Sequence, residues 1–225
     1  MGGGAANSGD THHQSHSSAI TWEVLQGRET EDNWQRRDEQ LGLLIHLFPP
    51  TEDDRDGAGW TASLRFYYHD ILAILQSPRT QLVLTCCRCL AVLTERLSPE
   101  HFEPLADVTL SALLRVCAST KRIVAAAAEP VLMGVFRLAP PIKTVQSVLV
   151  VLSDRNAALR QRVLEAFLRA VRVAPERWMT GGKHAEAMER IILAAVTDAA
   201  PAVRESALGL LALAEAHAAA LDAQV

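Results

Sequence analysis

The sequence predicts an all-α protein built from stacked pairs of helices, and three observations carry this prediction. Hydrophobic residues make up 49% of the 225 residues but aromatic residues only 5%, so Ala and Leu must supply most of a core in which helices pack closely. Apolar residues recur every three or four positions, and the alternation typical of β-strands never persists. A short polar segment also recurs between apolar stretches, which indicates an internal repeat.

The N-terminal segment differs from the rest of the chain. Residues 1–19 are mostly Gly, Ser, Asn and His, so they offer little to bury and we expect a disordered tail. His12, His13 and His16 lie in this tail, where a solvated cluster is expected rather than a metal site. Residues 20–225 are expected to form a single domain.

The first helix is expected directly after Asp32 and Asn33, which can cap it. The apolar residues that follow are at helical spacing: Leu41, Leu44, Ile45 and Phe48. Trp34 lies on the extension of this stripe, so two interpretations stay open. It is either a core residue or an exposed aromatic anchor beside Arg36 and Arg37, as found in interface hot spots.

Four further pairs of helices are expected after it. The first two pairs are predicted at residues 64–76 with 82–97 and at residues 102–118 with 123–138. The apolar stripes of the last two pairs are Ile142, Val145, Val148, Leu149 and Leu152; Leu159, Val163, Ala166, Phe167 and Ala170; Met188, Ile191, Ile192, Ala195 and Val196; and Val203, Ala207, Leu210, Leu211 and Ala214. Proline and glycine predict a surface loop at 49–59 and a break at 175–183.

The repeat is clearest where residues 152–164 are compared with residues 196–208. Asp154 aligns with Asp198, and Arg160 aligns with Arg204. A spacing of roughly 35–45 residues per pair is that of HEAT and armadillo repeats, in which stacked pairs share a core that no pair could bury alone. We therefore expect an α-α superhelix of about five helix pairs, with an irregular helical bundle as the alternative.

The aspartate of each repeat is expected to open the second helix by accepting a bond from its free N–H groups. The arginine six residues later can reach either an aspartate of its own turn or the neighbouring turn. In a stack of this kind, the turns inside the pairs lie along one edge. That edge is the predicted binding surface.

Positive charge is concentrated in the middle repeats. Nine Lys or Arg residues and three acidic residues lie between Ser119 and Arg172, although the whole chain has a net charge of −4. This predicts an acidic protein partner, steered by the turn residues Lys121, Arg122 and Arg155. A second group is expected to pair internally or to be solvated on the backs of helices: Arg137, Arg162 and Arg169.

Several function classes are not supported by the sequence. The acidic net charge argues against general nucleic-acid binding, and no apolar run reaches the roughly 18 residues of a membrane span. No phosphate-binding glycine loop or nucleophile motif occurs, and Cys86, Cys87 and Cys89 on one helix cannot share one metal. We expect no enzyme activity, cofactor or metal. The start of the chain and the cysteine spacing favour the cytoplasm.

Four segments resemble, in order, the TOG domain of the CLIP-associating protein (CLASP) family. Residues 27–34 followed by Arg37 resemble its opening, residues 114–123 its third-repeat turn, residues 153–156 its fourth and residues 198–204 its fifth. The resemblance runs from about Ile20 to the end of the fifth pair. At the fifth turn, Ala199 and Ala200 replace the polar residues that are usual in the family, which implies weaker contact there.

The resemblance implies a module that binds tubulin and stabilises microtubules, acting in the cytoplasm on the cytoskeleton and the mitotic spindle during cell division. In the family, an aromatic residue on the first turn and basic or polar groups on later turns contact tubulin. The implied site is Trp34, Arg37, Arg79, Thr80, Lys121, Arg122, Arg155 and Asn156. With a single such domain, support from a further microtubule-associated protein or self-association is expected. A HEAT-repeat scaffold for another acidic protein is the alternative.

Overall fold

The computed structural model describes residues 20–47, 57–180 and 182–223. Within these ranges the chain forms one 3₁₀-helix and ten α-helices, and no strand. The elements are η1 (Trp22–Leu25), α1 (Trp34–Leu47), α2 (Gly57–Ile74), α3 (Thr80–Arg96), α4 (Pro99–Cys117), α5 (Arg122–Leu138), α6 (Pro141–Leu152), α7 (Ala157–Val173), α8 (Pro175–Met179), α9 (Gly182–Val196) and α10 (Pro201–Asp222).

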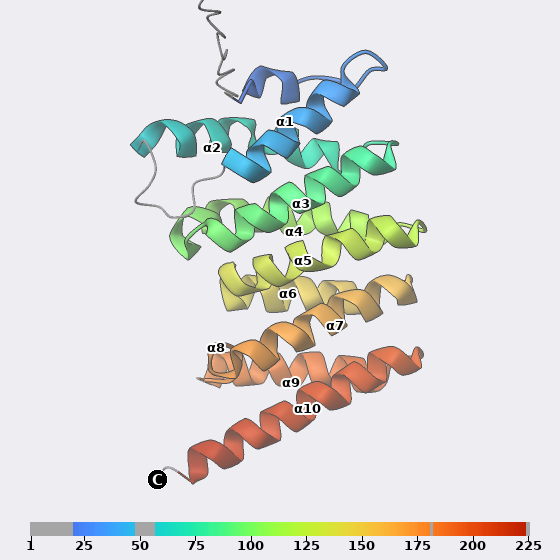
Figure 1. Cartoon of the computed structure of the whole chain (residues 1–225). Helices are drawn as coiled ribbons and strands as arrows, with labels where there is room; N and C mark the ends of the chain where they lie inside the picture. The colour runs from blue at the N-terminus through green and yellow to red at the C-terminus, as the bar shows by residue number, and fades with distance from the viewer. Residues whose placement is uncertain (1–19, 48–56, 181, 224–225) are drawn as a thin grey trace, which may run out of the picture.

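The helices stack in two layers, as Figure 1 shows. One layer holds α1, α3, α5, α7 and α10, and each of these helices contacts the next. The other layer holds α2, α4, α6 and α9. The pairs α2–α3, α4–α5, α6–α7 and α9–α10 therefore repeat one unit, and η1 stands in for the first helix of the pair that ends in α1. The expected superhelix of about five pairs is confirmed.

The apolar stripes read from the sequence form one continuous core. Its largest fully buried side chains include those of Tyr68, Phe102, Phe136, Phe167 and Trp178. The ring of Phe167 meets the ring of Phe136 edge-on at 5.8 Å and the ring of Trp178 at 5.1 Å, so aromatic contacts link α5, α7 and α8. The stack is thus held from the inside along its length.

Two predicted boundaries were wrong. The predicted break at 175–183 contains α8, because Pro175 occupies a first-turn position that proline favours and Trp178 is buried, with only 2% of its surface exposed. The predicted loop at 49–59 overlaps α2, which already begins at Gly57. The predicted tail at 1–19, the rest of that loop and Phe48 lie outside the described residues.

Candidate partner-binding edge

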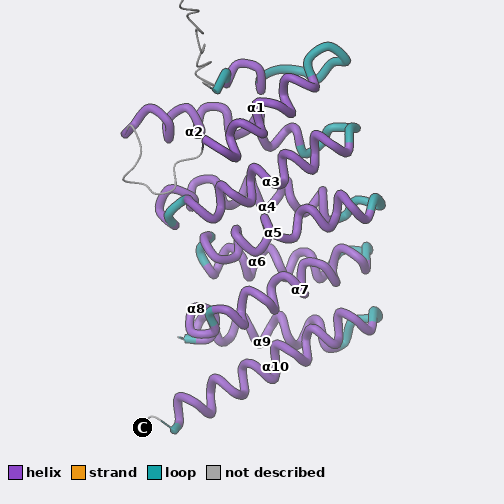
Figure 2. Tube along the Cα trace, viewed as in Figure 1, coloured by secondary structure: helices purple, strands orange, loops and turns teal. Residues whose placement is uncertain are grey.

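The five segments that connect the two helices of each pair lie along one edge of the stack. They are residues 26–33, 75–79, 118–121, 153–156 and 197–200, and we call them the turn edge. Figure 2 shows these loops in a row, while the described connections that follow α3, α5 and α7 lie at the opposite edge. The predicted alignment of the turns is therefore present in the structure.

Four of the five turns are closed by the same local bond. In each, a side-chain oxygen accepts the backbone N–H two residues further on, which gives the turns a common shape. The bonds are Ser77 Oγ with Arg79 N at 3.0 Å, Ser119 Oγ with Lys121 N at 3.2 Å, Asp154 Oδ1 with Asn156 N at 2.7 Å and Asp198 Oδ1 with Ala200 N at 2.7 Å.

The aspartates therefore act one step earlier than the sequence predicts. Asp154 closes the turn, and Asn156 caps α7 by accepting the N–H of Leu159 at 3.2 Å. The arginine six residues after each aspartate holds that turn too, because Arg160 Nη1 donates to the Asp154 carbonyl and Arg204 Nη1 donates to the Asp198 carbonyl, both at 2.7 Å.

A side chain also links each turn to the next, so the five loops are connected in series. Arg160 bonds to two turns at once, since its guanidinium reaches the Asp198 carboxylate as well as the Asp154 carbonyl of its own turn. The four links are Arg79 with Glu29, Lys121 Nζ with Thr80 Oγ1 at 3.2 Å, Asn156 Nδ2 with the Ala118 carbonyl at 3.5 Å, and Arg160 Nε with Asp198 Oδ2 at 2.7 Å.

Trp34 lies at one end of this edge, and it is neither fully buried in the core nor fully exposed. It is half-buried and packs against the core, and the Arg79 guanidinium lies 5.4 Å from its ring centroid. Arg79 is itself paired with Glu29 and with Glu31, the latter at 2.5 Å, and the bond to Glu31 raises the pKa of Arg79. The charge of Arg79 is therefore largely matched by carboxylates of its own chain.

Arg37 is a correction to the predicted site. Only 3% of its surface is exposed, and its guanidinium donates to the Gln26 carbonyl and, at 2.7 Å, to the Gly27 carbonyl. Its charge is therefore buried, and its hydrogen bonds to these two carbonyls hold the first turn in place. A signal was present in the sequence, because Arg37, Leu41 and Leu44 follow the helical spacing of one buried face.

Arg155, in the fourth turn, and Arg122, at the first position of α5 beside the third turn, are the predicted site cations whose charge is unmatched. Both are exposed, and neither side chain makes a hydrogen bond or ion pair with any described residue. Three other arginines have partners within the chain, as expected from the sequence: Arg137 donates to the Thr94 carbonyl, Arg162 donates to the Cys117 carbonyl at 2.6 Å, and the exposed Arg169 pairs with Glu129. Only a few of the basic side chains in the middle repeats are therefore free to contact a partner.

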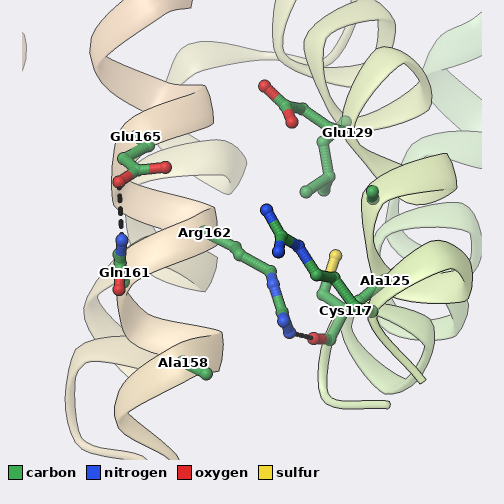
Figure 3. Close-up of a pocket in the computed structure, with 10 residues that line it drawn as sticks. Cys117, Ala125, Glu129, Ala158, Gln161, Arg162 and Glu165 are labelled. Carbon is green, nitrogen blue, oxygen red and sulfur yellow. Dashed lines mark hydrogen bonds between the residues drawn. The ribbon is translucent and has the colours of Figure 1, made fainter. Parts of the chain in front are cut away.

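A cavity of about 310 Å³ lies between α5 and α7, behind the third and fourth turns. Its wall holds two arginines, Arg122 and Arg162, and two glutamates, Glu129 and Glu165, so its charge is balanced. Figure 3 shows Arg162 reaching the Cys117 carbonyl on one side, and Gln161 bonded to Glu165 on the other. This balance gives the cavity no preference for an anion or a cation.

Within the part of the chain that the structure describes, no cluster of three or more His, Cys, Asp or Glu side chains is placed to hold a metal. No described helix has both the length and the apolar composition that crossing a bilayer requires. The four cysteines are buried and unpaired, as core residues.

The chain is similar to one protein family and to several known proteins. A family model described as CLASP N terminal matches residues 16–212. Protein stu-1 of Neurospora crassa is 25% identical over 184 residues, which cover 80% of this chain and 16% of stu-1. The chain thus spans about one sixth of that relative.

Two solved structures have a similar fold. The MAST/Orbit N-terminal domain superimposes with a TM-score of 0.63 at 14% identity, covering 88% of this chain and 82% of that one. A structure of microtubule polymerases with TOG domain arrays, described for tubulin recruitment and assembly, gives a TM-score of 0.64 at 15% identity and covers 85% of this chain and 39% of that one. At these identities the likeness concerns the fold alone.

Proposed function

Because the chain belongs to the CLASP N-terminal family, as a TOG-type domain, we propose that it binds tubulin through its turn edge and thereby regulates and stabilises microtubules. The observation that carries the proposal is the row of aligned turns, with a half-buried indole at one end and unpaired guanidinium groups along it. Such an edge suits a large acidic protein surface better than a small molecule. Other TOG arrays are described as recruiting tubulin, which supports this choice of partner.

Within this proposal the predicted site residues divide by role. Trp34 supplies the apolar anchor, and Arg122 and Arg155 supply unmatched positive charge. A second group shapes the edge through its links between turns: Arg79, Thr80, Lys121 and Asn156. Arg37 leaves the contact set, because its guanidinium is buried under the first turn.

We further propose that residues 20–225 act as one non-catalytic binding domain, located with the microtubule cytoskeleton in the cytoplasm and on the mitotic spindle. The continuous core supports one domain. The relative stu-1 is a much longer protein, and this chain matches about one sixth of its length. A further microtubule-associated protein or self-association would then supply additional tubulin sites, since avidity grows with the number of linked sites.

Gel filtration of the full chain with αβ-tubulin tests the proposal. We expect a co-eluting complex that weakens at least about tenfold in the double variant Arg122→Glu/Arg155→Glu, because charge reversal at two edge positions opposes an acidic partner. The matched control is Arg88→Glu/Arg172→Glu, which changes two exposed arginines outside the turns by the same charge. It should bind tubulin as the parent chain does.

Two outcomes would count against the proposal. Equal weakening by both double variants would mean that net charge, not the turn edge, governs binding. No complex at micromolar concentrations, with helical content intact by circular dichroism, would favour the alternative function, a HEAT-repeat scaffold for a different acidic protein.

A further inference from the structure

A second cavity opens on the turn edge itself, between the second and third turns. It has a volume of about 250 Å³ and is formed by the second and third turns, the end of α4 and the starts of α3 and α5. Its polar wall consists of Gln76, Ser77, Thr80, Arg115, Ser119 and Lys121. Two repeats thus form the cavity together. Each of the two turns contains a serine whose side chain accepts a backbone N–H of the same turn.

The charge in this cavity is positive and unmatched. Arg115 is exposed and has no hydrogen bond or ion pair among the described residues. The Lys121 ammonium contacts uncharged oxygens, namely Thr80 Oγ1 at 3.2 Å and the Pro78 carbonyl at 3.5 Å. No carboxylate lies in the wall, whereas each of three other cavities has at least one glutamate in its lining.

The hydroxyl groups of the wall add hydrogen-bond donors. Ser77 Oγ and Ser119 Oγ each accept a backbone N–H, and Thr80 Oγ1 accepts from Lys121. A hydroxyl that accepts in this way still carries its own hydrogen for a further acceptor. Two cations and three O–H groups therefore converge on a space with no internal anion.

We propose that this cavity is a subsite for a carboxylate side chain of the protein that docks on the turn edge, with Arg115 as its principal cation. This inference rests on the proposed function, and it adds a residue and a ligand chemistry to it. Charge-assisted bonds from a guanidinium and an ammonium are the strong bonds to carboxylates. The described wall holds no aromatic side chain on which a nucleobase could stack, so a protein carboxylate fits better than a nucleotide.

The first experiment follows the side-chain Nε–H signal of Arg115 by NMR in the full chain. The probe is a hexaglutamate peptide, and separate arms use inorganic phosphate and sodium chloride at matched ionic strength. We expect a saturable shift with the peptide and none with chloride. A shift with phosphate but not with the peptide, or an Arg115 signal that no arm moves, would overturn the assignment.

A substitution of nearly the same shape can place a carboxylate in the cavity before any partner binds. Gln76 is exposed in the wall and its side chain makes no hydrogen bond with described residues, so Gln76→Glu leaves the turn bonds untouched. The tethered carboxylate should abolish the peptide-induced shift and weaken tubulin binding roughly tenfold, because like charges oppose each other at close range. Gln146→Glu makes the same charge change on α6, outside the cavity, and should do neither.

The tubulin measurement separates the two proposals. Unchanged tubulin binding by Gln76→Glu and by Arg115→Gln would refute the subsite, while the turn-edge function would stand if Arg122→Glu/Arg155→Glu still weakened the complex. Absence of any tubulin complex would refute the proposed function instead. A saturable Arg115 shift with the peptide would then still support the carboxylate subsite.

Discussion

Arg160 and Asp198, 38 residues apart in the chain, form a two-point ion pair across the turn edge. Arg160 Nε lies 2.7 Å from Asp198 Oδ2, and Arg160 Nη2 lies 2.8 Å from Asp198 Oδ1. Both side chains are mostly buried, with exposed fractions of 10% and 7%. The pair fixes the fourth turn against the fifth, and a third bond from the same guanidinium closes the fourth turn itself.

Asp198→Asn should destabilise the fold by about 1.5–3 kcal/mol, the usual value of hydrogen bonds to charged groups. The reason is that Arg160 would keep its buried position but lose its anionic partner. Urea unfolding followed by circular dichroism measures the change. Asp107→Asn is the control, because Asp107 forms only an exposed pair with Lys143 at 3.0 Å and should cost less than about 1 kcal/mol. Equal losses in both variants would contradict the assigned role.

The same pair predicts how stability responds to acid. The hydrogen bond from Arg160 lowers the pKa of Asp198 below its ordinary value, with help from the Ala200 N–H and against the effect of burial. A carboxyl whose folded pKa lies below its unfolded pKa stabilises the fold fully above the unfolded value, about 4, and loses that contribution as pH falls through the folded value. The free energy of unfolding measured between pH 6 and pH 2.5 should therefore fall less steeply below pH 4 in Asp198→Asn than in the parent chain.

Two adjacent arginines should differ sharply on replacement. Arg37→Ala should lower stability by about 2–3 kcal/mol, because it removes charged donors from the Gln26 and Gly27 carbonyls. Arg36→Ala should be within about 0.5 kcal/mol of the parent, since Arg36 is exposed. Thermal unfolding of the two variants compares them directly. A neutral Arg37→Ala would contradict the assigned role of Arg37 in holding the first turn.

Gly134 marks a close approach of α5 to α3. A Cβ atom at this position would overlap the Cβ and Oγ1 atoms of Thr94, so Gly134→Ala should destabilise the protein by about 1–3 kcal/mol. Gly42, also in a helix, has nothing within 4 Å of a built Cβ, and Gly42→Ala should stabilise by about 0.5–1 kcal/mol. Midpoints of denaturant unfolding that move in the same direction for both variants would disprove this contrast.

The cysteines should be inert in the folded protein. Burial raises the pKa of Cys87, Cys89 and Cys117 to about 12 and raises that of Cys86 well above its ordinary value. Since the thiolate is the reactive form, Ellman's reagent at pH 8 should label none of them promptly. Four thiols should react once the chain is unfolded in guanidinium. Rapid labelling of a single thiol in the native protein would show that its helix opens readily.

Much of the fold follows from the sequence because the repeat encodes it locally. The stripe that contains Leu159, Val163 and Phe167 predicts a helix and its buried face, and both are found in α7. The aligned Asp154 and Asp198 predict equivalent turns, which the structure contains. The helix α8 was missed because five residues are too few to establish a period, so the burial of Trp178 decides that segment.

The site is less predictable, because its charges are settled by partners distant in the chain. Arg79 looks available in the sequence, yet Glu29 and Glu31, about 50 residues earlier, match its charge. Arg115 falls within the segment 114–123 that resembles a family turn, but its place in the last turn of a helix does not mark it as a site residue in the sequence. Only the stacking of α4 beside α2 gives Arg115 and Gln76 a common cavity.

The links between successive turns also affect what docking costs. A loop that must become ordered on binding gives up conformational entropy, and that loss subtracts from affinity. Here Arg79, Lys121, Asn156 and Arg160 already restrain the five loops in the unbound chain. Association should therefore fix few additional backbone torsions. Removing one of these four links would weaken binding chiefly by making the loops more flexible, even where every residue that touches the partner is kept.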